Sequence, residues 1–172
     1  MFELSHMVWS EKYRPNRVED CILPKTTKKM IQGFLKSGQL PNMILSGPAG
    51  TGKSTCALAI CAELGYEVMM INGSNEGRLI DTLRTKIAQF ASTMSFDGAR
   101  KCVIIDEADY MSTESVQPAL RNFIDEFTVN CTFILTCNFP NRLMEPLHSR
   151  CTGIDFTIPT NELDELTKEI FK

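Results

Sequence analysis

A glycine-rich segment constrains the fold of this chain more than any other feature of the sequence. Gly47-Pro48-Ala49-Gly50-Thr51-Gly52-Lys53-Ser54 matches G-x-x-x-x-G-K-[ST] at every fixed position. The apolar run 43–46 precedes it, and residues 53–64 continue in a helical pattern. This context predicts a strand, a phosphate-binding loop and a helix, in that order. Backbone N–H groups and the positive end of the helix would surround phosphate oxygens.

The side chains of this loop indicate a nucleotide triphosphate as the ligand. Lys53 supplies a positive charge for the β- and γ-phosphates, and the Ser54 hydroxyl is a candidate Mg²⁺ ligand. We therefore expect ATP and Mg²⁺ to bind here. The expected nucleotide contacts are Gly47, Pro48, Ala49, Gly50, Thr51, Gly52, Lys53, Ser54 and Thr55.

Polar side chains follow two further apolar runs. Asp106 and Glu107 come directly after the apolar run 103–105, and Asn138 closes the run 131–136. Carboxyl ends of parallel strands meet at one edge of an open sheet, which is the edge that binds ligands. We expect Asp106 to hold Mg²⁺, Glu107 to polarise the attacking water, and Asn138 to reach the γ-phosphate or that water. An Asn that closes a strand is more often only a turn former.

Strand and helix patterns alternate along the chain, which predicts an α/β fold with a five-stranded parallel sheet flanked by helices. The expected strands are 43–46, 67–71, 102–105, 131–136 and 153–156. The expected helices are 26–36, 53–64, 78–92 and 115–127, with Pro118 tolerated because it lies in a first turn. A further helix is expected to start after Thr160.

Size and composition set limits on function. With 172 residues and 43% apolar side chains, the chain can bury one core. The net charge of −3 gives no general attraction to nucleic acid, so a DNA contact requires a local basic patch. We expect no membrane span and no secretory signal, hence a cytoplasmic protein, in the host cytoplasm if viral. The seven scattered cysteines predict free core thiols in a reducing compartment.

The order of these motifs resembles that of AAA+ ATPases, a family of P-loop NTPases. Ser149-Arg150-Cys151, after the Asn-ended strand, narrows the resemblance to subunits of sliding-clamp loaders, the relatives of replication factor C. In that family the arginine reaches the ATP of the neighbouring subunit. The resemblance therefore implies that Arg150 acts in trans on the γ-phosphoryl group. An ordinary surface arginine is the alternative.

The beginning of the chain extends this resemblance. Trp9-Ser10-Glu11-Lys12-Tyr13-Arg14-Pro15 is similar to the W-x-x-K-Y-R-P segment that lies against the adenosine in clamp loaders. The resemblance implies nucleotide contacts by Ser10, Glu11, Lys12, Tyr13 and Ile22. Together with 19–24, 72–74, 90–92 and 95–98, the segment is most similar to the large subunit of T4-type phage clamp loaders. The resemblance to clamp-loader subunits covers residues 8–159.

The resemblance also implies domains and partners. Residues 1–159 are expected to form the AAA+ core with its adenine-contacting segment, and 160–172 the start of a truncated or missing helical lid. Partners would be other clamp-loader subunits in a hetero-oligomeric ring, the sliding clamp and primer–template DNA. Clamp loaders of this family follow the DNA backbone with basic and hydroxyl groups, which are contacts without sequence specificity. The matching candidates are Arg78, Arg84, Ser112 and Thr113.

Other functions remain open from the sequence. Another AAA+ switch of DNA replication or repair shares the P-loop and the acidic strand. A nucleotide-binding structural module with little hydrolysis of its own is a second alternative. Residues 106–109 spell DEAD, but helicases with that signature need a second RecA-like domain, for which this chain has no room. A small-molecule kinase needs an acceptor pocket, for which we find no candidate residues.

Overall fold

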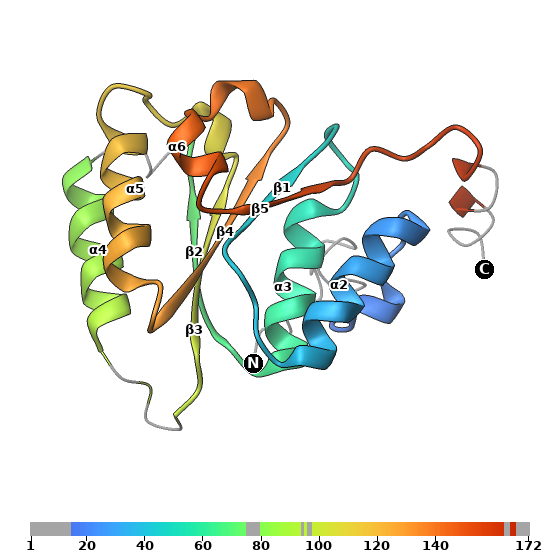
Figure 1. Cartoon of the computed structure of the whole chain (residues 1–172), viewed down its shortest axis with the longest axis horizontal. Coiled ribbons are helices and arrows are strands. Elements are labelled where there is room, and N and C mark those ends of the chain that lie inside the picture. The colour runs from blue at the N-terminus through green and yellow to red at the C-terminus, as the bar shows by residue number, and fades with distance from the viewer. Residues whose placement is uncertain (1–14, 75–79, 94, 96–97, 164–165, 168–172) are drawn as a thin grey trace, which may run out of the picture.

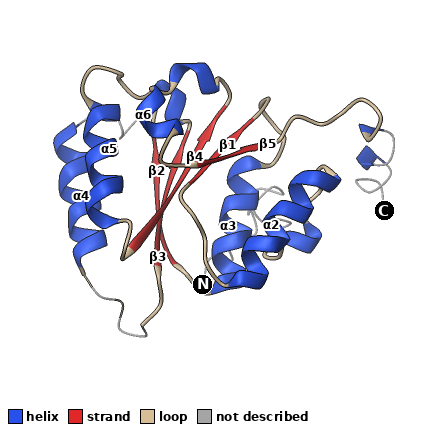
Figure 2. Cartoon of the chain, in the orientation of Figure 1, coloured by secondary structure: helices blue, strands red, loops and turns tan. Residues whose placement is uncertain are grey.

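A parallel sheet with helices on both faces forms the centre of the molecule (Figures 1 and 2). The computed structural model describes residues 15–74, 80–93, 95, 98–163 and 166–167. Within these residues the strands are β1 (Met43–Ser46), β2 (Glu67–Asn72), β3 (Lys101–Asp106), β4 (Cys131–Cys137) and β5 (Thr152–Asp155). They lie in the order β2-β3-β4-β1-β5, and every neighbouring pair is parallel. Because β1 lies between β4 and β5, the chain changes its direction across the sheet beside β1, where open α/β sheets bind ligands.

Helices cover the two faces of the sheet in pairs. In Figure 1, α4 (Ile80–Ser92) and α5 (Val116–Phe127) lie on one side of the strands, and α2 (Lys25–Ser37) and α3 (Lys53–Leu64) on the other. Because both faces are covered, the strands need apolar residues on both sides. The remaining short elements are α6 (Glu145–His148) and the 3₁₀ turns η1 (Val18–Asp20), η2 (Ala108–Tyr110) and η3 (Pro140–Arg142).

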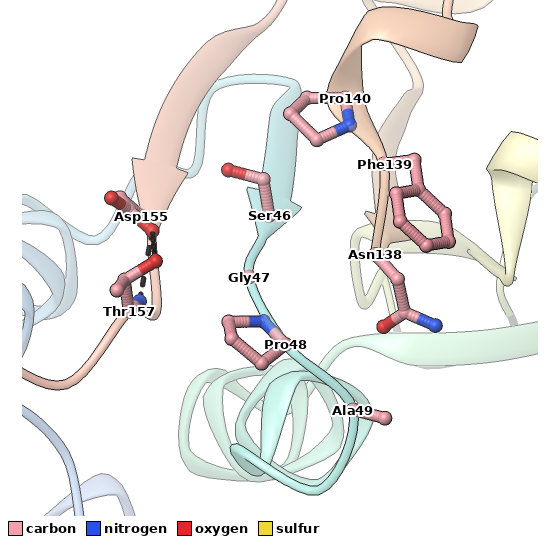
Figure 3. Close-up of a pocket in the computed structure, with 9 residues that line it drawn as sticks. All are labelled: Ser46, Gly47, Pro48, Ala49, Asn138, Phe139, Pro140, Asp155 and Thr157. Atoms are coloured by element: carbon pink, nitrogen blue, oxygen red, sulfur yellow. Dashed lines mark hydrogen bonds between the residues drawn. The ribbon is translucent and has the colours of Figure 1, made fainter.

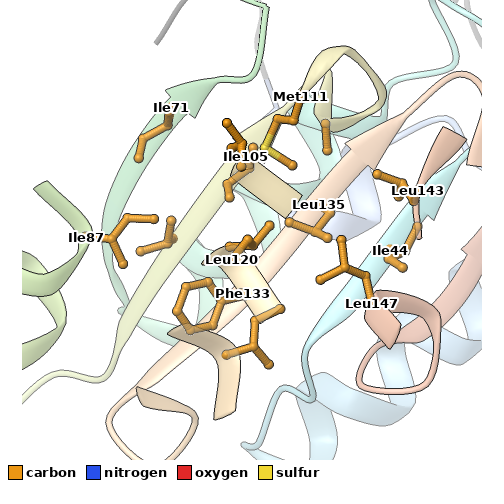
Figure 4. Packing of buried hydrophobic residues seen from close by; sticks show 14 of the residues in the cluster. Ile44, Ile71, Ile87, Ile105, Met111, Leu120, Phe133, Leu135, Leu143 and Leu147 are labelled. Carbon is orange, nitrogen blue, oxygen red and sulfur yellow. The ribbon is translucent and has the colours of Figure 1, made fainter. Parts of the chain in front are cut away.

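Two apolar cores form because successive side chains of a strand point to opposite faces. In β4, Phe133 and Leu135 pack in the core beneath α4 and α5, whereas Ile134 packs in the core beneath α2 and α3. In β3, Ile105 belongs to the first core and Ile104 to the second, and both are fully buried. Figure 4 shows part of the first core, with side chains from the strands meeting those from the helices. Packing in the two cores holds the strands in place, and the ends of the strands are positioned as a result.

The predicted fold class is confirmed, including the five parallel strands. The fifth strand begins and ends one residue earlier than predicted, at Thr152 and Asp155, because it is defined by its pairing with Met43–Ser46 of β1. Phe156 still donates its N–H to the carbonyl of Ser46 at 2.7 Å. In α5, Pro118 is the third residue, where its missing N–H costs no helical hydrogen bond.

The cysteines behave as core groups, as predicted. All seven are free thiols, and all but Cys151 are buried. Burial raises the pKa of Cys131 to about 11 and that of Cys137 to about 12. Thiols with such pKa values are protonated at neutral pH and are therefore poor nucleophiles.

Across the described part of the chain, no helix is both long enough and apolar enough to cross a membrane.

Candidate nucleotide-binding site

The glycine-rich loop connects the end of β1 to the first turn of α3. Gly50 and Gly52 have φ angles of 79° and 84°, in the left-handed region that favours residues without a Cβ. Helical hydrogen bonding begins at Gly52, whose carbonyl accepts from the N–H of Cys56 at 2.8 Å. The first N–H groups of a helix have no intrahelical acceptor, so they are available to an anion at this end of α3.

Lys53 lies inside the loop and is only 7% exposed. Its Nζ donates hydrogen bonds to the carbonyls of Gly47 and Pro48, both at 2.7 Å, and to Oδ1 of Asn138 at 2.9 Å. Burial lowers the pKa of Lys53 because the ammonium loses hydration, while the nearby Asp106 partly opposes the shift. The loop therefore holds a positive charge among its own carbonyls, beside the end of β4.

Asp106 joins three elements at the carboxyl edge of the sheet. Its Oδ1 accepts hydrogen bonds from the hydroxyl of Ser54 on α3 and from that of Thr136 on β4, both at 2.5 Å. Charge-assisted hydrogen bonds of this kind are short and strong. The carboxylate is thereby fixed next to the first turn of α3.

Glu107 follows Asp106 with an unusual backbone. Its φ and ψ are 54° and 45°, and it is the one residue other than glycine with positive φ in the described part of the chain. The N–H of Glu107 donates to Thr136 Oγ1 at 3.2 Å. On the other side, Gly73 donates its N–H to the carbonyl of Asp106 at 2.7 Å. A Cβ on Gly73 would lie 2.6 Å from the carbonyl oxygen of Glu107, so only glycine permits this approach.

Asp109 holds the segment that carries Asn138. Its carboxylate is buried, and Oδ2 accepts hydrogen bonds from the N–H groups of Asn138 at 3.3 Å and Phe139 at 3.2 Å. Its Oδ1 has no hydrogen-bond partner among the residues that the structure describes. The turn after β4 is therefore tied to η2, and the side chain of Asn138 is directed to Lys53.

These side chains line one cleft. Its volume is about 330 Å³, and it is bounded by Lys53, Ser54, Asp106, Glu107 and Asn138 among others. A larger pocket of about 670 Å³ adjoins it and shares Ala49 and Asn138. Figure 3 shows this larger pocket between the turn that follows β5 and the turn that follows β4, with the glycine-rich loop running between them. The structure thus brings the predicted loop, acid pair and asparagine together.

Ile22 lies at the opposite end of the loop. Together with Leu23 and Ile158 it lines a pocket of about 350 Å³ that includes Gly50, Gly52 and Thr55. Ile22 is 36% exposed, so its side chain is available to a flat apolar ligand. The geometry agrees with the adenine contact expected for Ile22, which stays a prediction.

Arg150 lies outside the cleft. Its Nε and Nη2 donate to the two carboxylate oxygens of Asp125 on α5, at 2.6 and 2.9 Å. The paired side chains are 32% and 51% exposed. This hydrogen bonding raises the pKa of Arg150 and lowers that of Asp125. Arg150 does not line the cleft that contains its own chain's Lys53.

Several predicted contacts stay predictions. Ser10, Glu11, Lys12, Tyr13 and Arg78 lie outside the described residues. The three other DNA candidates do not line the nucleotide cleft. Of these, Arg84 on α4 and Thr113 are exposed and Ser112 is half-buried.

Two residues of the site were missed by sequence reasoning. Thr136 bridges Asp106 and Glu107, and Asp109 holds the turn at Asn138. Both are polar residues among apolar ones and both are buried in the structure. A buried hydroxyl or carboxylate is normally hydrogen-bonded, so a Thr near the end of an apolar strand is a usable signal. The partner of such a side chain, however, cannot be read from the sequence.

The residues present fit a magnesium ion. Ser54 and Asp106 offer a hydroxyl and a carboxylate oxygen within 2.5 Å of each other. Mg²⁺ prefers oxygen ligands and is usually bound by one or two protein groups together with substrate phosphates. No cluster of three or more His, Cys, Asp or Glu side chains suited to a metal occurs among the described residues.

Comparison with known proteins gives consistent matches. Residues 43–159 match the model of the "ATPase family associated with various cellular activities (AAA)". The chain is 38% identical to the sliding-clamp-loader large subunit of Enterobacteria phage T4, over 93% of this chain and 50% of that protein. It is 41% identical to human replication factor C subunit 5, over 94% of this chain and 49% of that protein. The chain thus spans about half the length of the curated relatives it matches.

Among solved structures, the fold is similar to that of the Thermotoga maritima RuvB Holliday junction branch migration motor. The TM-score is 0.66 at 23% sequence identity, over 91% of this chain and 53% of that chain. At this identity the likeness concerns the fold alone. The predicted resemblance to the T4-type large subunit and to replication factor C is confirmed by the curated relatives.

Proposed function

Because this chain belongs to the AAA family of ATPases, we propose that it is the ATPase core of a sliding-clamp loader. It binds ATP with Mg²⁺ and hydrolyses the ATP so that a clamp is loaded onto primer–template DNA during replication. The single observation that carries the proposal is that one cleft beside the glycine-rich loop is lined by Lys53, which is bonded to the loop carbonyls, and by the hydrogen-bonded pair of Ser54 and Asp106. Such a cluster places a cation, a hydroxyl and a carboxylate where a triphosphate would lie.

Each side chain has a role in this proposal. Lys53 and the N–H groups at the start of α3 bind the phosphates. Ser54 and Asp106 hold Mg²⁺, which supplies charge neutralisation on the β- and γ-phosphates when bound. Glu107 orients and polarises the attacking water, and Asn138 contacts that water or the γ-phosphate. Positioning and charge stabilisation account for most of the catalysis in phosphoryl transfer.

Arg150 acts on a neighbour's nucleotide in this proposal. Support comes from its partly exposed position away from its own cleft, with the guanidinium paired with Asp125. An arginine supplied in trans raises the hydrolysis rate by about 10³–10⁵ in NTPases that use one. The neighbours would be other clamp-loader subunits in a hetero-oligomeric ring. The proposal places the protein in the cytoplasm, that of the host if the source is a virus.

The first experiment measures MgATP binding and hydrolysis separately. Calorimetric titration with ATP and a non-hydrolysable analogue, with and without Mg²⁺, should give Mg²⁺-dependent binding. Hydrolysis should rise when partner subunits, clamp and primed DNA are added. Glu107→Gln should abolish the rise and keep the binding. Absence of Mg²⁺-dependent binding would refute the proposal.

Mixing tests the trans role of Arg150. Arg150→Ala chains are assembled with wild-type neighbours. To assign hydrolysis to individual sites, Glu107→Gln is introduced into one chain at a time. The variant's own nucleotide should still bind, and activity should fall at the neighbouring site. Binding without stimulated hydrolysis in any mixture would instead indicate a nucleotide-binding structural module, the alternative class of function.

A further inference from the structure

We propose that the hydroxyl of Thr136 is the positioning group that couples Asp106 to Glu107, a role that rests on the proposed ATPase function. Thr136 is 2% exposed and lies two residues before Asn138 near the end of β4. Among the described residues, it is the one side chain for which hydrogen bonds to both residues of the acid pair are seen. It acts through its neighbours, since no reacting atom is assigned to Thr136 itself.

The hydrogen bonds around Thr136 form a directed chain. The N–H of Glu107 donates to Thr136 Oγ1 at 3.2 Å, and the hydroxyl proton of Thr136 points to Asp106 Oδ1 at 2.5 Å. The same oxygen of Asp106 accepts the hydroxyl proton of Ser54. A hydroxyl has one proton and two lone pairs, so Thr136 can make both of its contacts at once. These hydrogen bonds therefore connect α3, β3 and β4 through one side-chain oxygen, Asp106 Oδ1.

The backbone of Glu107 gives the first reason for this contact. A non-glycine residue in the left-handed region costs of order 1 kcal/mol or more and persists only when its surroundings hold it there. Thr136 holds Glu107 on the side of β4, and Gly73 approaches its carbonyl oxygen from the side of β2. Because φ and ψ of Glu107 decide where its side chain points, losing the Thr136 contact lets the carboxylate move relative to the glycine-rich loop.

The carboxylate of Asp106 gives the second reason. Two hydroxyl protons on Oδ1 fix the rotation of the carboxyl group about its bond to Cβ. Without Thr136, the Ser54 hydroxyl is the one hydrogen-bond donor left on this oxygen among the described residues. Groups that orient a metal-binding carboxylate typically affect metal binding or activity by about 10–100-fold when they are removed.

Thr132 in the same strand is a buried threonine with a structural role, and it serves as a comparison for Thr136. It is also buried, at 7% exposed, and its hydroxyl approaches the carbonyl of Leu40 at 3.5 Å. No hydrogen bond joins its hydroxyl to a predicted site residue in the described part of the chain. The two positions therefore allow the same substitution in the same strand with different expected consequences.

The test compares Thr136→Val with Thr136→Ser in the assembled loader. Valine keeps the shape and removes the hydroxyl, whereas serine keeps the hydroxyl. We expect kcat of Thr136→Val to fall by about 10–100-fold with KM for ATP changed less than about threefold. Thr136→Ser should recover most of kcat. Thr132→Val should leave kcat within about twofold of wild type, whatever its effect on thermal stability.

A second readout does not require hydrolysis. Amide hydrogen exchange of Glu107, followed by NMR, should be faster in Thr136→Val than in wild type and Thr136→Ser, because its acceptor has been removed. If folded Thr136→Val hydrolyses ATP like wild type, the inference is wrong. If wild type itself does not hydrolyse ATP under any condition, the proposed function fails instead. In that case the exchange rate of the Glu107 amide is the test of the Thr136 contact. An equal rate in Thr136→Val and wild type would overturn the inference.

Discussion

The charged clusters around Lys53 and around Arg150 differ in how many of their contacts come from buried groups of the same chain. Around Lys53, buried donors and acceptors from three strand ends and the start of α3 meet within hydrogen-bonding distance. Around Arg150, the charged partner is the carboxylate of Asp125, the other acceptors are the Pro146 carbonyl and the Ser149 hydroxyl, and both members of the ion pair are substantially exposed. The first cluster is built into the fold, whereas the second is a surface ion pair.

This difference indicates which interactions are complete before any partner binds. Most buried polar groups are hydrogen-bonded in a folded chain, because leaving one unpaired costs about 1–3 kcal/mol. The Lys53 cluster is therefore preorganised by folding. An exposed ion pair is screened and contributes little to stability, so Arg150 can exchange Asp125 for another anion at small cost. Four predictions test this contrast, from the largest effect to the smallest.

Removing the buried charge should have the largest effect. Lys53→Met keeps the length of the side chain but removes the ammonium that contacts Gly47, Pro48 and Asn138. We expect ATP affinity to fall by at least about 100-fold, consistent with the loss of a desolvated charge contact. Calorimetry measures this, with Lys36→Met on the exposed side of α2 as the control. Equal affinities for both variants would show that Lys53 does not contact phosphate.

A methyl group at Gly73 should damage the acid pair from the other side. Its Cβ would meet the Glu107 carbonyl oxygen at 2.6 Å and the Asp106 carbonyl oxygen at 3.1 Å. We expect Gly73→Ala to lower the free energy of unfolding by about 1–3 kcal/mol. The rate of hydrolysis should fall by a larger factor than the affinity for ATP. Denaturant titration and steady-state kinetics measure the two effects.

Gly33→Ala is the matched control for Gly73→Ala. Gly33 lies within α2, and a Cβ there would meet no atom within 4 Å. Alanine should stabilise the helix by about 0.5–1 kcal/mol. If both variants behaved alike, the close approach between Gly73 and Glu107 would not constrain the site.

The pKa of Lys53 predicts a pH dependence. Because burial lowers this pKa, the ammonium loses its proton at a lower pH than an exposed lysine, whose pKa is about 10.4. ATP affinity should therefore decline as the pH rises toward that value. Stability without ATP should change oppositely: the cost of the buried charge is fully present below the folded-state pKa and is relieved as the pH rises through it. Calorimetry and unfolding are measured over a series of pH values, with Lys53→Met as reference. The fall in ATP affinity and the rise in stability with pH should both occur in wild type and be absent from Lys53→Met.

Asp125→Asn should have the smallest effect. The substitution removes the charge partner of Arg150 and leaves the nucleotide cleft intact. ATP affinity should stay within about twofold of wild type, and trans-stimulated hydrolysis should fall by only about two- to fivefold as the guanidinium becomes less ordered. A loss as large as that of Arg150→Ala would show that the exposed pair is as essential as the buried cluster.

Much of the fold could be predicted because it depends on local patterns. The apolar runs of β1, β3 and β4 and the glycine-rich loop are continuous in sequence, and each strand end was placed within about one residue. The family resemblance was also readable, because its motifs occur in a fixed order. The roles of Asn138 and Arg150 followed from that order and stay predictions.

Local sequence is sufficient to show which side chains are available at the carboxyl edge of the sheet, because Lys53 and Ser54 end the glycine-rich loop and Asp106 and Glu107 end an apolar strand. How these side chains are held depends on contacts between distant segments. Thr136 lies 30 positions from Asp106 and Asp109 lies 29 positions from Asn138. These pairs meet because β3 and β4 are neighbours in the sheet, and Gly73 reaches Glu107 because β2 lies beside β3. Such contacts depend on strand order and register, which are set by packing of the whole sheet and not by any local run of residues.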